Sequence, residues 1–185
     1  MKSEPDSPTG VDTPSEVHIV VTDEQTDVAI DAPRWERLAH AVLVAEGQVG
    51  ELTLTFVDDA DMAELNAEHM GKHGPTDVLS FPLDAFDASD AAPFPDGGPV
   101  LLGDVVICPG VAAAAAPLHA GTVDDEIALL VVHGILHVLG HDHSEPEETH
   151  RMRARELEHL TRLHWQGPPP SGFVHEQEEQ QEEVS

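Results

Sequence analysis

The chain has 185 residues, 40% of them hydrophobic, and a formal charge of −28 that comes from 36 acidic and only 8 basic side chains. This length suits one folded domain with flanking segments, and the scarcity of cations argues against a broad electrostatic surface for nucleic acids. The sequence lacks an apolar run of the roughly 18 residues that a membrane helix needs, and residues 1–16 do not resemble a signal peptide. Because Cys108 is the single cysteine, internal disulfides are excluded, and we expect a cytoplasmic protein without membrane contact.

Strands and helices mix along the first half of the chain. The hydrophobic pattern and the positions of Pro and Gly predict strands over 17–23, 51–57 and 78–82, and helices over 33–47 and from 58 or 59 to 70. Residues 84–99, which are rich in Asp, Pro, Gly and Ala, are predicted to form an exposed loop.

The second half adds a strand over 101–108, a short helix over 112–116 that ends at Pro117, a long apolar helix capped by Thr122, and a last helix over 147–164. Together the elements predict an α+β fold, with a four-stranded mixed sheet packed against about five helices.

Residues at the two ends of the chain have no apolar periodicity. Residues 175–183 contain five glutamates and three glutamines. We therefore expect a disordered acidic tail over 1–16, a folded domain over 17–165, and a second disordered acidic tail over 166–185. Deletion of residues 172–185 should then leave the thermal stability almost unchanged.

The long apolar helix carries two histidines that point to a metal. His133 and His137 are four residues apart, so they project from the same helix face. Gly140 can adopt a left-handed conformation that ends the helix and turns His143 towards the first two imidazoles. Three imidazoles with one open coordination position are typical of a catalytic zinc site, which we place on this central helix and the turn after it.

Two features of this motif leave alternatives open. The spacing is that of a long metal-protease motif, but Gly134 stands where those enzymes carry their glutamate general base, which disfavours peptide hydrolysis. His141 lies four residues after His137 and competes with His143 as the third ligand if the helix continues. An isolated histidine in an apolar helix is usually a packed residue, whereas three at this spacing favour a metal.

Three segments, in order, resemble the motifs of the YbeY family of bacterial rRNA maturation factors. They are Gly74-Pro-Thr-Asp-Val-Leu-Ser-Phe-Pro82, Leu102-Gly-Asp-Val-Val-Ile-Cys108 and His133-Gly-Ile-Leu-His-Val-Leu-Gly-His-Asp-His143, and the resemblance spans roughly residues 17–164. It implies a zinc-dependent, single-strand-specific endoribonuclease of late small-subunit maturation that acts at the 3′ end of the 16S rRNA. One Zn²⁺ per chain would be held by His133, His137 and His143. The implied partners are single-stranded rRNA and the small ribosomal subunit, not DNA.

The chain departs from the family pattern at one position. Many members carry an arginine just before the Gly-Lys pair that precedes the first of these segments, and here that position is Met70, whereas Lys72 is retained. A zinc-bound water would act as the nucleophile. Lys72 and Asp142 are candidate catalytic residues, although Asp142 could equally orient a histidine or cap a helix. Thr76, Asp77 and Ser80 would line the cleft or close a turn.

Two other functions compete with an RNA-cleaving enzyme. One is a metallohydrolase of another kind, such as a peptidase, against which Gly134 argues. The other is a non-catalytic ribosome-assembly factor in which zinc stabilises the fold, an alternative that Met70 and the negative charge keep open.

Overall fold

The computed structural model describes residues 16–83, 100–141 and 144–175. The elements follow one another as β1 (Val17–Asp23), α1 (Ala32–Ala45), β2 (Gly50–Phe56), α2 (Asp59–Met70), β3 (Val78–Pro82), β4 (Leu101–Ile107), α3 (Pro109–Ala115), η1 (Ala116–Leu118), α4 (Val123–Val138), α5 (Pro146–His159) and η2 (Leu160–His164). The predicted loop over 84–99 and both predicted tails, except for residues 16 and 166–175, lie outside the described residues.

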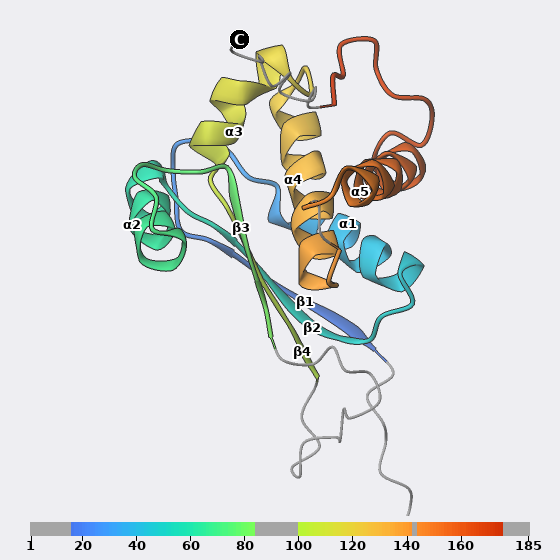
Figure 1. Cartoon of the computed structure of the whole chain (residues 1–185), viewed down its shortest axis with the longest axis horizontal. Helices are drawn as coiled ribbons and strands as arrows, with labels where there is room; N and C mark the ends of the chain where they lie inside the picture. Colours follow the sequence, from blue (N-terminus) through green and yellow to red (C-terminus); the bar gives the residue numbers. More distant parts are fainter. Residues whose placement is uncertain (1–15, 84–99, 142–143, 176–185) are drawn as a thin grey trace, which may run out of the picture.

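The four strands form one mixed sheet in the order β1-β2-β4-β3. Strands β1, β2 and β4 are parallel, and β3 pairs antiparallel with β4, so that Leu79 lies opposite Val106. The sheet is seen at the centre of Figure 1, with α2 at one side and α4 and α5 at the other. The predicted α+β class, with a four-stranded mixed sheet and five α-helices, is therefore confirmed in the described residues.

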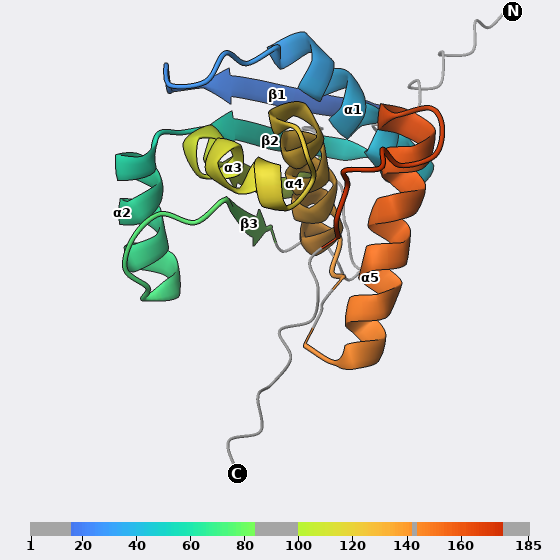
Figure 2. The ribbon, with the colours of Figure 1, turned by 90° about the horizontal axis from the view of Figure 1, so that it is seen from above.

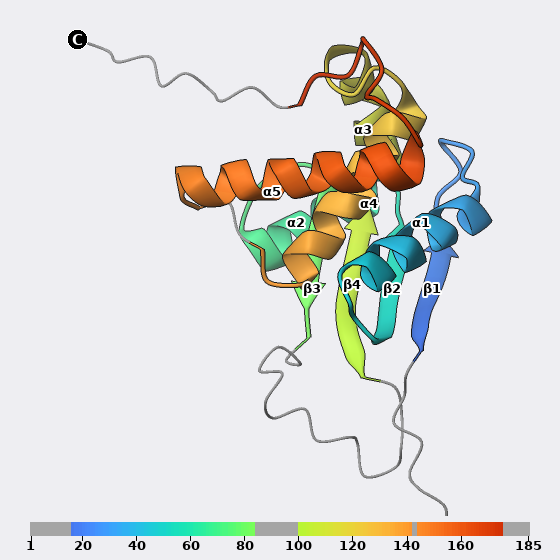
Figure 3. The same cartoon turned by 90° about the vertical axis from the view of Figure 1, so that its right-hand side faces the viewer.

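The two faces of the sheet are covered differently. Helices α1, α4 and α5 lie on one face, where α5 crosses α4 (Figure 3), and Leu52, Leu54 and Phe56 of β2 are fully buried there. Side chains alternate along a strand, so Val106 points to the opposite face from Val105. On that opposite face α2 contributes Met62 to a smaller apolar cluster.

Helix α4 is buried along nearly its whole length, and its two ends are those that the sequence predicts. The Thr122 hydroxyl accepts a hydrogen bond from the Asp125 amide at 3.1 Å, which satisfies one of the unpaired N–H groups of the first turn. After the helix ends, Gly140 has a φ of +88°, the left-handed conformation that turns the chain. The helix therefore crosses the core and delivers its last turn to the surface near α5.

Helices α3 and α5 differ from the prediction at their ends. Helix α3 begins at Pro109, three residues before the predicted start, because proline is well suited to the first helical position, where no N–H partner is needed. Pro117 does not end the chain's helical turns but lies inside the 3₁₀ turn η1. The predicted last helix is divided into α5 and the π-helical turn η2.

The chain after η2 is packed, so the folded domain extends beyond the predicted boundary at residue 165. It turns back towards the start of α4 (Figure 2), and the rings of Trp165 and Phe173 meet edge to face at 4.9 Å. The Val174 amide donates to the His119 carbonyl at 2.7 Å, and His175 contacts Glu156. We call residues 167–175 the C-terminal strap. None of the helices in the described part of the chain is long and apolar enough to span a membrane.

The packing of the strap changes the expected outcome of a truncation. Deleting residues 172–185 removes the Phe173 and His175 contacts, so we expect a loss of about 2 kcal/mol of unfolding free energy and a melting temperature lower by several degrees. Deleting only residues 176–185 keeps every contact described for the strap and serves as the control. Thermal melts of both truncations and the parent make the comparison, and equal melting temperatures would show that the strap contributes nothing.

Asp125 joins the start of α4 to the end of the α5 region. Its carboxylate accepts hydrogen bonds from the Thr122 hydroxyl at 2.7 Å, the Trp165 indole at 2.7 Å and the His164 imidazole at 2.8 Å. Burial by itself would raise the pKa of Asp125, but these hydrogen bonds and the attraction of His164 outweigh it and hold the pKa below its ordinary value. The ionised carboxylate therefore stabilises the fold.

This lowered pKa makes the contribution of Asp125 depend on pH. Asp125→Asn should reduce the unfolding free energy by about 1–3 kcal/mol at pH 7, because hydrogen bonds to an ionised group are lost. Because the pKa of Asp125 is lower in the folded than in the unfolded protein, its stabilisation is fully present above the unfolded pKa of 3.8. This stabilisation is lost as the pH falls through the folded pKa, so the difference in unfolding free energy between variant and parent should shrink below pH 3.8. Denaturant unfolding from pH 7 to pH 3 tests this, with the exposed Glu36→Gln as a control. A difference that stays constant with pH would contradict it.

Candidate active site

His133 and His137 lie side by side on one face of α4, as their spacing predicts. Their ring centroids are 4.6 Å apart and the ring planes meet at 75°. Both residues belong to the end of the helix that reaches the surface next to α5. The structure therefore brings two of the three predicted metal ligands together, whereas His143 and Asp142 lie outside the described residues.

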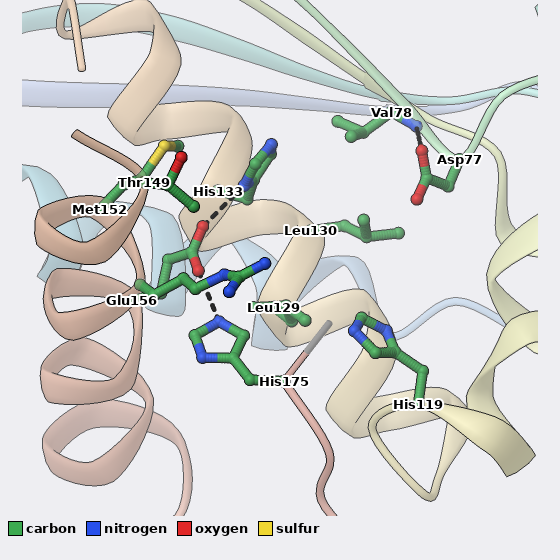
Figure 4. A pocket seen from close by; sticks show the side chains of 11 residues that line it. Asp77, Val78, His119, Leu129, Leu130, His133, Thr149, Met152, Glu156 and His175 are labelled. Carbon is green, nitrogen blue, oxygen red and sulfur yellow. Dashed lines mark hydrogen bonds and ion pairs between the residues drawn. The ribbon is translucent and has the colours of Figure 1, made fainter. Parts of the chain in front are cut away.

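A buried carboxylate from α5 holds the first of these histidines. Glu156 is only 3% exposed, and its two oxygens accept hydrogen bonds of 2.6 Å from His133 Nδ1 and of 2.6 Å from His175 Nε2 (Figure 4). Burial would raise the pKa of Glu156, but both hydrogen bonds and the attraction of the two imidazoles outweigh it and hold the pKa at about 2. Since the carboxylate is ionised at neutral pH, each of these imidazole nitrogens is a donor.

Glu156 and its two imidazole partners, His133 and His175, line a cavity of about 270 Å³. Its wall combines apolar side chains with imidazoles, two carboxylates and one guanidinium; it is formed by Asp77, Val78, His119, Leu129, Leu130, His133, Thr149, Met152, Arg153, Glu156 and His175. The residues come from the entry to β3, from the residue after η1, from α4 and α5, and from the C-terminal strap (Figure 4). The cavity is therefore a junction of five segments that are far apart in the sequence.

The polar residues of the segment before and within β3 have separate roles. Asp77 lines the cavity, and its carboxylate also accepts from the Val78 amide at 2.8 Å. The Thr76 hydroxyl donates to Asp77 at 3.2 Å and so closes the turn. The Ser80 hydroxyl donates to the Gly134 carbonyl at 3.2 Å and joins β3 to α4. Of the three residues predicted to line the cleft or close a turn, only Asp77 lines the cavity.

Lys72 and Met70 are not among the residues that line the cavity. Both are exposed at the end of α2, where Gly71 adopts a left-handed conformation with a φ of +65°. His141, the competing ligand, follows Gly140, and its amide donates to the Leu136 carbonyl at 3.0 Å. Helix α4 has ended before this residue, so His141 does not continue the face of His133 and His137.

A second histidine–carboxylate pair, of which only His119 lines the cavity, was not found from the sequence. His119 Nδ1 lies 2.8 Å from an oxygen of the buried Glu126, and the Ala120 amide donates to the same carboxylate at 3.1 Å. In the sequence, Glu126 is simply one of three acidic residues in the first turn of α4, where a negative charge is favourable. The pairing joins residues on either side of the turn before that helix, and no local pattern signals it.

Gly134 explains why the residue after the first histidine is not glutamate. A Cβ at this position would lie 2.5 Å from Val105 Cγ1 and 3.3 Å from Ser80 Oγ, so α4 packs against β4 and β3 without room for a side chain. Valine is β-branched and has few rotamers with which to give way. The absence of a general base at this position is thus a consequence of close helix–sheet packing.

This contact predicts the effect of adding a single methyl group. Gly134→Ala should reduce the unfolding free energy by about 1–3 kcal/mol, because overpacking costs more than the gain in helix propensity. Gly172→Ala is the matched control, since nothing lies within 4 Å of a Cβ at that glycine. Equilibrium denaturation of both variants provides the measurement. A Gly134→Ala protein as stable as the parent would mean that α4 moves away from the sheet without cost.

The chemistry of the described side chains suits a transition metal, although the described residues alone do not contain three converging metal-binding groups. Metal-binding histidines commonly donate their other ring nitrogen to a carboxylate, and His133 does so to Glu156. The fold and these paired histidines define the class: an α+β protein with a candidate histidine metal centre on its central helix.

Comparisons with known proteins identify the family. The sequence profile described as "Endoribonuclease YbeY" matches residues 20–164. The chain is 45% identical over 130 residues to a protein of that name from Thermobifida fusca, covering 69% of this chain and 83% of the relative. It is 44% identical over 137 residues to one from Frankia casuarinae, covering 72% and 68%. A solution structure from Thermotoga maritima is similar with a TM-score of 0.49 and 25% identity, covering 80% of this chain and 91% of that one.

A family profile that matches most of the chain, together with these relatives, settles the assignment. The chain belongs to the YbeY endoribonuclease family.

Proposed function

We propose that this protein is a zinc-dependent endoribonuclease that cleaves single-stranded rRNA during late maturation of the small ribosomal subunit, at the 3′ end of the 16S rRNA. The family assignment supports an RNA-cleaving activity. The observation that carries the metal chemistry is the short hydrogen bond from His133, which lines the cavity, to the buried Glu156, with the ring of His137 packed beside that of His133. The proposed place of action is the cytoplasm, where the small subunit is assembled.

Glu156 prepares His133 for a metal. It accepts from Nδ1, which fixes the imidazole tautomer and turns Nε2 outward as the coordinating nitrogen. His137 presents its ring from the same helix face, and His143 would complete a set of three ligands with one Zn²⁺ per chain. When bound, the metal supplies a Lewis acid for a phosphoryl oxygen and lowers the pKa of a water molecule.

The other residues at the site orient the substrate and limit competing reactions. Val78, Leu129 and Met152 form an apolar part of the cavity wall, which limits the access of water to the bound RNA. A peptidase is disfavoured, because Gly134 has no room for the glutamate on which the related proteases depend. Asp142 remains a candidate for orienting a ligand, and Lys72, which does not line the cavity, for a contact with RNA outside it.

Metal content and RNA cleavage test the proposal together. The parent should bind about one zinc, and His133→Ala, His137→Ala and His143→Ala should each lose it and abolish cleavage of a single-stranded RNA that contains the 16S 3′ end. Glu156→Gln should weaken zinc binding roughly 10–100-fold, because it removes the charged acceptor behind His133. Elemental analysis and a gel-based cleavage assay provide the measurements.

His141→Ala is the control for the third ligand and should keep both zinc and activity. If His143→Ala keeps its zinc and His141→Ala loses it, the third ligand is His141 and not His143. A zinc-loaded parent that leaves single-stranded RNA intact would refute the nuclease proposal and favour the non-catalytic assembly factor.

A further inference from the structure

Arg153 places a cation in the wall of the cavity beside His133. It lies on α5 three residues before Glu156, so the two side chains share a helix face. It is partly buried and is the only lysine or arginine among the residues that line the cavity. Arg153 is therefore about one helical turn from Glu156, the carboxylate that holds His133.

Arg153 has no counter-ion in the described part of the chain, although the protein is strongly acidic. Among the other basic residues described, Arg34, Arg155 and Arg162 form ion pairs with carboxylates. The remaining three make no ion pair with another described residue but are exposed to water; they are Arg37, Lys72 and Arg151. Arg153 is thus the one partly buried cation whose charge is not balanced by an ion pair in the described structure.

The two carboxylates that line the cavity accept hydrogen bonds from groups other than Arg153. Both oxygens of Glu156 accept from imidazoles, and Asp77 accepts from the Val78 amide and the Thr76 hydroxyl. A guanidinium that faces a cavity without a carboxylate partner is suited to an anion supplied from outside. Its planar fork of N–H groups matches two oxygens of a phosphate.

We propose that Arg153 anchors a phosphate of the RNA strand in this cavity, as a substrate-binding residue for the cleavage at the adjoining metal centre. This inference rests on the proposed function. The small cavity volume admits a segment of one strand and not a duplex. A single partly buried guanidinium also explains how a protein of charge −28 holds a polyanion, because one local contact takes the place of a basic surface.

Arg153→Ala is the variant that tests the anchor, and Arg151→Ala is its matched control. Arg151 is on the same helix and carries the same charge, but it is exposed and does not line the cavity. For zinc-loaded enzyme on single-stranded RNA, we expect Arg153→Ala to raise KM roughly 10–100-fold, as the loss of a charge-assisted hydrogen bond implies, with a smaller change in kcat. Arg153→Lys should recover part of the loss, and Arg151→Ala should behave as the parent.

Two further measurements separate binding from structure. Zinc content and melting temperature should be the same in all three variants. The salt dependence of RNA binding should become shallower by about 0.7 in Arg153→Ala, the slope that one phosphate contact on a single strand contributes. If the parent cleaves RNA but Arg153→Ala matches Arg151→Ala in KM and in salt slope, the inference is overturned and the proposed function stands.

The anchor can also be tested if the parent does not cleave RNA. In that case the proposed function fails, and direct binding of the same RNA oligonucleotide and of inorganic phosphate decides the role of Arg153. Binding that is weakened by Arg153→Ala and not by Arg151→Ala supports an anion site. Binding that both variants retain equally overturns it.

Discussion

Helix α4 lies against the sheet only because residue 134 has no side chain, and the rest of the site follows from that contact. Gly134 faces Val105 and Ser80, so the neighbouring His133 is turned away from the sheet towards α5. Helix α5 meets it there with Glu156. A bulkier residue at 134 would move the helix outward and carry both histidines with it. The helix–sheet distance therefore also sets the geometry of the candidate metal centre.

The interior of this protein repeatedly pairs an imidazole with a carboxylate. Besides the two bonds to Glu156, such pairs join His119 to Glu126, His159 to Glu46 and His164 to Asp125. The chain has 13 histidines but only 8 lysines and arginines for 36 acidic residues, so imidazoles provide many of the donors that buried carboxylates need. Glu156 differs from the other carboxylates because it binds two imidazoles, His133 from α4 and His175 from the strap, and all three residues line the cavity.

Features encoded by neighbouring residues were predictable. The Thr122 cap, the left-handed Gly140 and the shared face of His133 and His137 all depend on contacts within a few residues, and the strands follow from alternation of apolar side chains. The apolar residues after η2, by contrast, show no helical or strand periodicity; they are Trp165, Phe173 and Val174. Phe173 packs against the ring of Trp165, eight positions earlier in the chain, and no local sequence pattern indicates this contact.

The position of Arg153 in the cavity wall was also not predictable from the sequence, because it depends on how two helices pack. It is one of three arginines in α5, and the sequence favours a solvated helix face for most of such a cluster. Only the placement of α5 against α4 distinguishes Arg153, which faces the cavity, from the exposed Arg151. Lys72, which the motif favours, stands at the end of a helix on the other side of the sheet.

The strand order has a consequence for how the chain folds. Strand β4 is the last strand in the sequence but lies inside the sheet, between β2 and β3. Until it inserts, β2 has one unpaired edge and β3 has no partner in the described sheet. Both pairings join segments far apart in the chain, and such non-local contacts form slowly because the loops between them must close first. The exposed edge of β2 is therefore the point at which a partly folded chain is most prone to associate with another copy, and insertion of β4 is the step that removes this hazard.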